Sequence, residues 1–63
     1  MILVTNFAPL SRYDAPAKAQ RDAHRWLRRA LAEPGDWAVI LDSATGALKK
    51  RYVLRAGRVT RMQ

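Results

Sequence analysis

Positive charges recur at helical spacing in the stretch from residue 15 to residue 33. At about 100° per residue, five cations fall within one arc that is roughly 100° wide: Lys18, Arg21, Arg25, Arg28 and Arg29. Guanidinium and ammonium groups bind carboxylates and phosphates. This set, which we name the helix stripe, is therefore the first candidate site, for an anionic partner.

A second set of cations lies in the C-terminal part of the chain. If the turns pair Leu41 with Leu48 and Leu54 with Val59, strand alternation divides this part into two faces. The face predicted to meet the helix holds Trp37, Val39, Leu41, Leu48, Tyr52, Leu54 and Val59. The opposite face holds Lys49, Arg51, Arg55, Arg58 and Thr60, with Ala38, Ile40, Val53 and Met62 among them. Its cations are the second choice of site, because Ile40 and Val53 interrupt them, and a one-residue slip in register would exchange the two faces.

The loop before the helix offers a third, smaller candidate. Arg12 and Tyr13 lie there with Phe7 nearby, and aromatic residues beside arginine are enriched in protein interfaces. The alternative is that these aromatic side chains pack under the helix.

Residues with catalytic chemistry are sparse. His24 is the single histidine, no carboxylate lies over it at helical spacing, and we expect it to pack or to face solvent. Ser11 and Ser43 stand in turn contexts, and the chain has no cysteine and no glycine-rich phosphate loop. The sequence therefore predicts a protein that is not an enzyme and that carries no metal or cofactor.

The charge balance indicates the class of partner. Twelve Lys and Arg against five Asp and Glu give a formal charge of +7, which favours polyanions or acidic protein surfaces. Base stacking is disfavoured, because Trp37 and Tyr52 are predicted to face the core, and base-edge reading is disfavoured, because the helix stripe lacks Asn, Gln, Ser and Thr. Contact with the phosphate backbone remains. For both basic surfaces the alternative is a solvated face, which on a sheet also protects against aggregation.

The elements that must position these residues form one small α+β domain over residues 1–63, in the order β-α-β-β-β. A strand is expected at residues 2–7, a loop at 8–13, and a helix capped by Asp14, with Pro16 in its first turn, that ends at Glu33-Pro34-Gly35. The apolar side of this helix holds Ala19, Ala23, Trp26, Leu27, Ala30 and Leu31. Strands at 37–41, 48–55 and 58–62 follow as a meander, with turns at 43–46 and 56–57.

The N-terminal segment and the lack of cysteine bear on the compartment. Residues 1–6 contain no basic region, and their apolar run is too short for a signal peptide. No stretch is long enough to span a bilayer. We therefore expect a cytoplasmic protein without a membrane partner.

The segment 36–42 (Asp-Trp-Ala-Val-Ile-Leu-Asp), followed by the Thr45-Gly46 turn, looks like a hairpin of phage proteins. In size, and in packing one helix on a few strands, the chain resembles the small inhibitor proteins of phages and mobile elements, including anti-CRISPRs. The resemblance is one of architecture, so no functional residue is carried over. It implies an inhibitor or modulator that docks on a larger nucleic-acid-handling complex. The alternatives are an accessory protein that binds DNA or RNA non-specifically, and a small homo-oligomer; the chain is expected to be a monomer or a homodimer.

Overall fold

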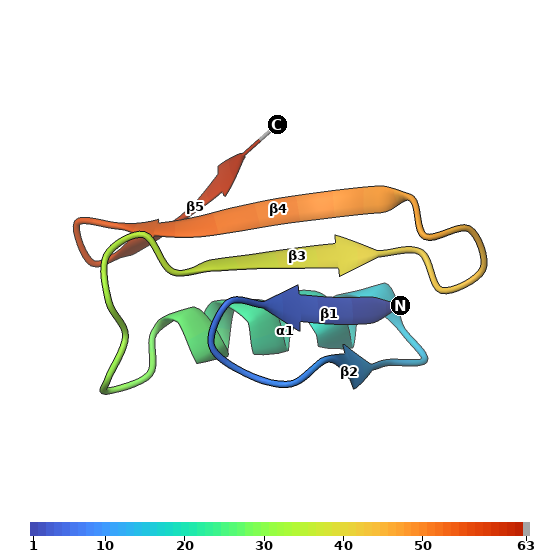
Figure 1. Cartoon of the computed structure of the whole chain (residues 1–63), viewed down its shortest axis with the longest axis horizontal. Coiled ribbons are helices and arrows are strands. Elements are labelled where there is room, and N and C mark those ends of the chain that lie inside the picture. The colour runs from blue at the N-terminus through green and yellow to red at the C-terminus, as the bar shows by residue number, and fades with distance from the viewer. Residues whose placement is uncertain (63) are drawn as a thin grey trace.

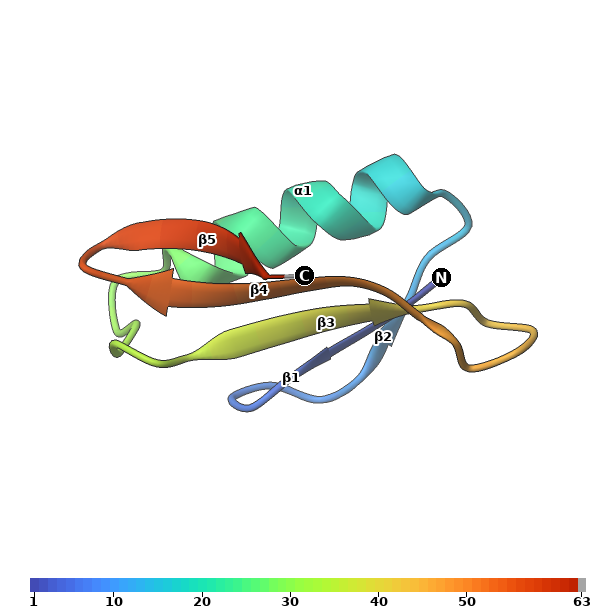
Figure 2. The ribbon, with the colours of Figure 1, turned by 90° about the horizontal axis from the view of Figure 1, so that it is seen from above.

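Five antiparallel strands form one sheet, and a single helix covers one of its faces (Figures 1 and 2). The structure is a computed structural model that describes residues 1–62. Its elements are β1 (Ile2–Thr5), β2 (Ser11–Arg12), α1 (Pro16–Leu27), β3 (Trp37–Leu41), β4 (Leu48–Arg55) and β5 (Arg58–Met62). The predicted α+β class is confirmed.

The strand order in the sheet is β2-β1-β3-β4-β5. Two tight turns build the β3-β4-β5 meander. Asp42 accepts hydrogen bonds from the amides of Ala44 and Thr45, at 2.8 and 3.1 Å, and so shapes the first turn. In the second turn Ala56 and Gly57 both have positive φ, 50° and 75°, as a type I′ hairpin requires.

The N-terminal part contains a strand that the sequence analysis assigned to a loop. β2 has only two residues, and it pairs with β1 through Ile2–Arg12 and Leu3–Ser11. A strand this short shows no alternation, so the pattern of apolar residues could not reveal it. β1 in turn ends at Thr5, two residues earlier than expected, and Thr5 Oγ1 accepts a hydrogen bond from the amide of Ala8.

α1 is shorter than its apolar pattern predicts. It ends at Leu27 instead of continuing to Glu33, and the amides of Arg28 and Arg29 donate to carbonyls only three residues back. Leu31, predicted to be core, is 85% exposed. A helix of this size is held mainly by packing, and the buried positions of α1 end at Leu27. Pro16 does lie in the first turn, but Asp14 does not cap the helix, because Ala15 is the N-cap residue.

The core lies between α1 and the sheet. Its buried side chains are Leu3, Ala19, Ala23, Leu27, Ala38, Ile40, Tyr52 and Leu54, and Trp26 packs against them. Three alanines in this set allow the helix to approach the strands closely. Leu27 and Trp26 thus lie on the core side of the helix, as predicted.

A β-bulge decides which residues of β3 face the helix. Both predicted pairs, Leu41–Leu48 and Leu54–Val59, are present. Ile40, the residue before Leu41, pairs with Lys50 and not with Lys49. Lys49 is therefore an extra residue in β4, opposite no residue of β3.

The extra residue reverses the predicted faces of β3. Ala38 and Ile40 are buried under the helix at 0% and 1% exposure, whereas Trp37, Val39 and Leu41 point to the opposite side together with Leu48. The prediction for these six residues is therefore wrong. For Tyr52 and Leu54 of β4 and Val59 of β5 it is confirmed, because their alternation lies beyond the bulge.

Candidate nucleic-acid interface

The helix stripe is largely neutralised by neighbouring carboxylates. Lys18 pairs with Asp14 at 3.3 Å and Arg25 pairs with Asp22 at 2.9 Å. Only Lys18, Arg21 and Arg25 belong to α1, because Arg28 is its C-cap residue and Arg29 lies beyond it. The stripe that the sequence predicts is thus shorter than expected and carries less net charge.

Arg29 belongs to the architecture of the fold. Its guanidinium pairs with Asp36 Oδ2 at 2.9 Å and lies 3.5 Å from the centroid of the Phe7 ring. Asp36 also accepts hydrogen bonds from the Glu33 amide and from Asn6 Nδ2, both at 3.0 Å. These bonds, led by the one from Glu33, and the neighbouring Arg29 lower the pKa of Asp36 although burial opposes them. Arg29 therefore holds the segment after α1 against the loop that follows β1.

Tyr13 is likewise committed to the fold. Its hydroxyl donates to Asp22 Oδ2 at 2.6 Å, and burial together with this bond raises the pKa of Tyr13 to about 12. Its ring packs against the core, which corresponds to the alternative of loop packing. Arg12 is exposed on β2, in register with Ile2.

His24 packs as expected. Its ring meets the Tyr52 ring edge-on at a centroid distance of 4.8 Å. Tyr52 is 4% exposed, and this burial raises its pKa. His24 is therefore placed as a packing residue beside the core.

The β4–β5 hairpin carries almost all of the net charge. Residues 1–42 hold six cations and all five acidic residues, whereas residues 43–63 hold six cations and no acidic residue. The net charge of +7 is thus +1 in the first two thirds of the chain and +6 in the last third. The six residues, which we name the hairpin cations, are Lys49, Lys50, Arg51, Arg55, Arg58 and Arg61.

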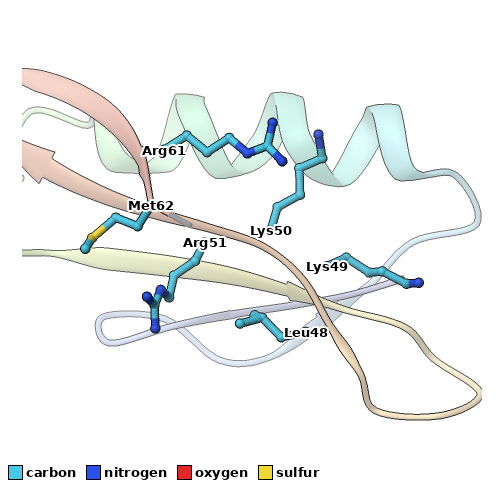
Figure 3. Close-up of a pocket in the computed structure, with 6 residues that line it drawn as sticks. All are labelled: Leu48, Lys49, Lys50, Arg51, Arg61 and Met62. Carbon is cyan, nitrogen blue, oxygen red and sulfur yellow. The ribbon is translucent and has the colours of Figure 1, made fainter.

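The hairpin cations lie on both faces of the sheet. Arg51, Arg55 and Arg58 point away from α1, as predicted for the second-choice site. Lys50 and Arg61 extend toward the side that bears α1, and Figure 3 shows them opposite Arg51. Lys49, also predicted for the outward side, is the bulge residue between them.

Four of these cations line one open hollow. The hollow has a volume of about 540 Å³ and lies where β4 runs past Arg51–Met62, the last pair of β4 and β5 within residues 1–62 (Figure 3). Its lining is Leu48, Lys49, Lys50, Arg51, Arg61 and Met62. No carboxylate is among these lining residues, and a bound anion would reduce the mutual repulsion of the four cations.

Sequence reasoning missed Lys50 and Arg61. Period-2 alternation places Lys50 on the face of Tyr52, and a position on the core face predicts packing rather than binding. The split of charge between the two parts of the chain was a readable signal, since a block of like charges without acidic residues commonly marks an interaction segment.

The face of the sheet opposite α1, which we name the outer face, is apolar over much of its area. Its apolar residues are Ile2, Val4, Trp37, Val39, Leu41, Leu48, Val53 and Met62. Trp37 is 39% exposed, so the expectation that it faces the core is wrong. One of the two reasons for disfavouring base stacking therefore no longer holds. Tyr52 does face the core.

The chain matches no protein-family model, no curated protein and no solved structure. Within residues 1–62, α1 is too short and too polar to cross a bilayer.

Proposed function

We propose that this protein is a non-enzymatic binding protein that contacts the phosphate backbone of nucleic acid through the hairpin cations. The observation that carries this proposal is the concentration of six cations on β4 and β5, with no acidic residue in residues 43–63. Phosphate contacts of this kind are independent of base sequence.

The dimensions of the hairpin suit a stretch of backbone. From Lys49 to Arg55, β4 spans about 20 Å at about 3.4 Å per residue. One strand of a duplex advances about 3.4 Å per phosphate along its axis, so β4 is long enough to lie beside several phosphates.

The sequence ranked the helix stripe first, and the ion pairs of Lys18, Arg25 and Arg29 reverse that order. A pair of triple variants separates the two surfaces. Lys49→Glu/Lys50→Glu/Arg61→Glu alters the hairpin, and Arg21→Glu/Arg25→Glu/Arg28→Glu alters the helix stripe by the same formal charge.

Because both variants have the same net charge, a difference between them reports the location of the site. We expect the hairpin variant to lose binding to a labelled 20-base-pair duplex by at least tenfold relative to the helix variant, measured by fluorescence anisotropy at 50 mM salt. Equal losses, or a larger loss in the helix variant, would contradict the hairpin as the site.

The second candidate function is that of an inhibitor or modulator docking on a larger nucleic-acid-handling complex, similar to the anti-CRISPR proteins of phages. The bare apolar outer face favours it, because such faces mark protein interaction sites more often than nucleic-acid sites. Phosphate contact at the hollow uses Lys49, Lys50 and Arg61, none of which is among the apolar residues of the outer face, so one protein can do both.

A further inference from the structure

We propose that the outer face of the sheet binds an acidic amphipathic helix of another protein. This interaction goes beyond nucleic-acid binding, and its apolar residues lie on the side of the sheet opposite Lys50 and Arg61. It rests on the composition of β1 and β3, on the absence of any covering element within residues 1–62, and on the charge around the apolar area.

β3 has the composition of a strand that is buried on both sides. Its five residues, Trp37–Leu41, are all apolar, whereas a strand with one solvated face alternates apolar and polar residues. The outward positions of β1, Ile2 and Val4, are apolar as well. Only the inward side of these two strands is covered, by α1 (Figure 2).

Cross-strand pairing makes the apolar residues contiguous. Ile2 lies beside Leu41, and Val4 lies beside Val39. Trp37 lies beside Val53, and Leu41 lies beside Leu48. Neighbouring strands are about 4.8 Å apart, so these side chains form one continuous surface rather than isolated exposed residues.

Arginines lie at the ends of this apolar area and once within it. Arg12 lies next to Ile2 on β2, and Arg55 pairs with Arg58 at the far end of the hairpin, whereas Arg51 lies inside the area, between Val39 and Met62. No outward position of the five strands within residues 1–62 is acidic. Charge complementarity therefore calls for a partner with apolar contacts at its centre and carboxylates at its margins.

A second copy of this chain does not meet that requirement. A two-fold contact would place the same surface on both sides, and because no outward position of the five strands within residues 1–62 is acidic, the arginines of one copy would meet no carboxylate there on the other. Single-stranded nucleic acid meets it poorly, because Trp37 is the single aromatic side chain on the outward positions of the five strands within residues 1–62, and the side chains of Ile2, Val4 and Val39 donate no hydrogen bonds.

The size of the apolar area fits a short helix. β3 is about 17 Å long at about 3.4 Å per residue, and a helix covers that length with about 11 residues at 1.5 Å each. α1, with 12 residues, covers the inward face in the same way. The binding of a second helix would give the sheet a helix on each face.

Three synthetic 18-residue peptides test the inference. The first has leucines at helical i, i+3, i+4, i+7 spacing and glutamates elsewhere. The second has the same composition with the leucines scrambled, and the third has lysines in place of the glutamates. Trp37 emission reports binding in a Trp26→Phe background, where Trp37 is the only tryptophan. We expect saturable binding and a blue shift with the first peptide, at least tenfold weaker binding with the second, and none with the third.

Two variants in that background locate the contact. Val39→Asp places a charge in the middle of the outer face, and Ala17→Asp places the same charge on the exposed side of α1. Val39→Asp should weaken binding of the first peptide at least tenfold, and Ala17→Asp should change it less than twofold. Should Val39→Asp unfold, Arg55→Glu/Arg58→Glu replaces it, because both residues are exposed, and should weaken binding at least threefold.

Several results would overturn the inference. If the scrambled peptide bound as tightly as the first, the interaction would be charge attraction alone. If the folded outer-face variant bound the first peptide as the parent does, the contact would lie elsewhere. A dimer in sedimentation that Val39→Asp abolishes would make a second copy the occupant. A single-stranded oligonucleotide that shifts Trp37 emission in the parent but not in Val39→Asp would assign the face to nucleic acid.

A further variant distinguishes loss of peptide binding by the outer face from loss of duplex binding by the hairpin. Lys50→Glu/Arg61→Glu alters the side of the sheet that bears α1 (Figure 3). At 150 mM salt, where charges are screened over about 8 Å, this variant should lose duplex binding and keep its affinity for the first peptide within about threefold. A parallel loss of both activities would contradict the assignment of two separate surfaces.

Discussion

Replacing Leu27 by alanine tests where the helix stops packing. Leu27 is fully buried at the last residue of α1, whereas Leu31, four residues later, is 85% exposed. Truncation of a buried leucine costs about 2–5 kcal/mol. A domain of 63 residues has a total free energy of unfolding of only about 3–9 kcal/mol, at about 0.05–0.15 kcal/mol per residue. Leu27→Ala should therefore remove a large share of the stability.

Leu31→Ala is the matched control, because the substitution is the same and Leu31, only four residues later, is exposed and lies outside α1. An exposed truncation changes stability by less than about 0.5 kcal/mol. At about 4–8 °C per kcal/mol for a domain of this size, we expect Tm to fall by at least about 8 °C for Leu27→Ala and by less than about 4 °C for Leu31→Ala.

Thermal unfolding followed by circular dichroism measures both variants. If Leu31→Ala destabilised the protein as much as Leu27→Ala, the helix would pack as far as residue 31, as its apolar pattern predicts, and the end of α1 at Leu27 would be wrong. If Leu27→Ala left Tm unchanged, Leu27 would not belong to the core.

Three further predictions follow from the charges and hydrogen bonds. With phosphate contacts by the four cations that line the hollow, the log-log slope of duplex affinity against salt should be about −4, and neutral Lys49→Gln/Lys50→Gln/Arg61→Gln should reduce it to about −1; an unchanged slope would remove these residues from the interface. Because the pKa of folded Asp36 is below its ordinary 3.8, the unfolded chain binds this proton first as pH falls. The stability that this carboxylate contributes is therefore complete above the ordinary pKa and is lost as pH falls through the folded pKa. Asp36→Asn should be less stable at pH 7 and should lose less stability between pH 5 and 2 in urea unfolding; an identical pH dependence would contradict this role. The phenol of Tyr13 should titrate near pH 12 by ultraviolet absorbance, and a Tyr13→Phe difference titration that gives an ordinary value near 10 would refute its buried hydrogen bond.

The sequence predicts the elements well where a local pattern is long enough. The alternation along β4 and the positive φ required at Gly57 identify the second hairpin, and the helical spacing of Ala19, Ala23 and Leu27 identifies the buried side of α1. The paired residues Leu41–Leu48 and Leu54–Val59 follow from turn chemistry. These features depend on neighbours within a few positions, so they can be read without the fold.

The candidate site was only partly predictable. Arg51, Arg55 and Arg58 lie outward as expected, and the charge that makes the hairpin a candidate is a property of composition. Lys50 and Arg61 escaped prediction because alternation assigns them to the core face, while the ends of β4 and β5 leave both near the open hollow.

By itself, the sequence determined the α+β class, the order of the helix and of every strand except β2, and the positive charge of the C-terminal third. Tertiary structure alone decided that Arg29 is committed to the fold, because its partner Asp36 lies beyond the end of α1, across the turn that follows the helix. It also decided the face of Trp37 and Val39. The extra residue, Lys49, shifts the pairing of β3 with β4 by one position, so the β3 residues predicted to face the helix point to the opposite side. A bulge of this kind is set by the pairing of two strands, which the pattern within either strand does not contain.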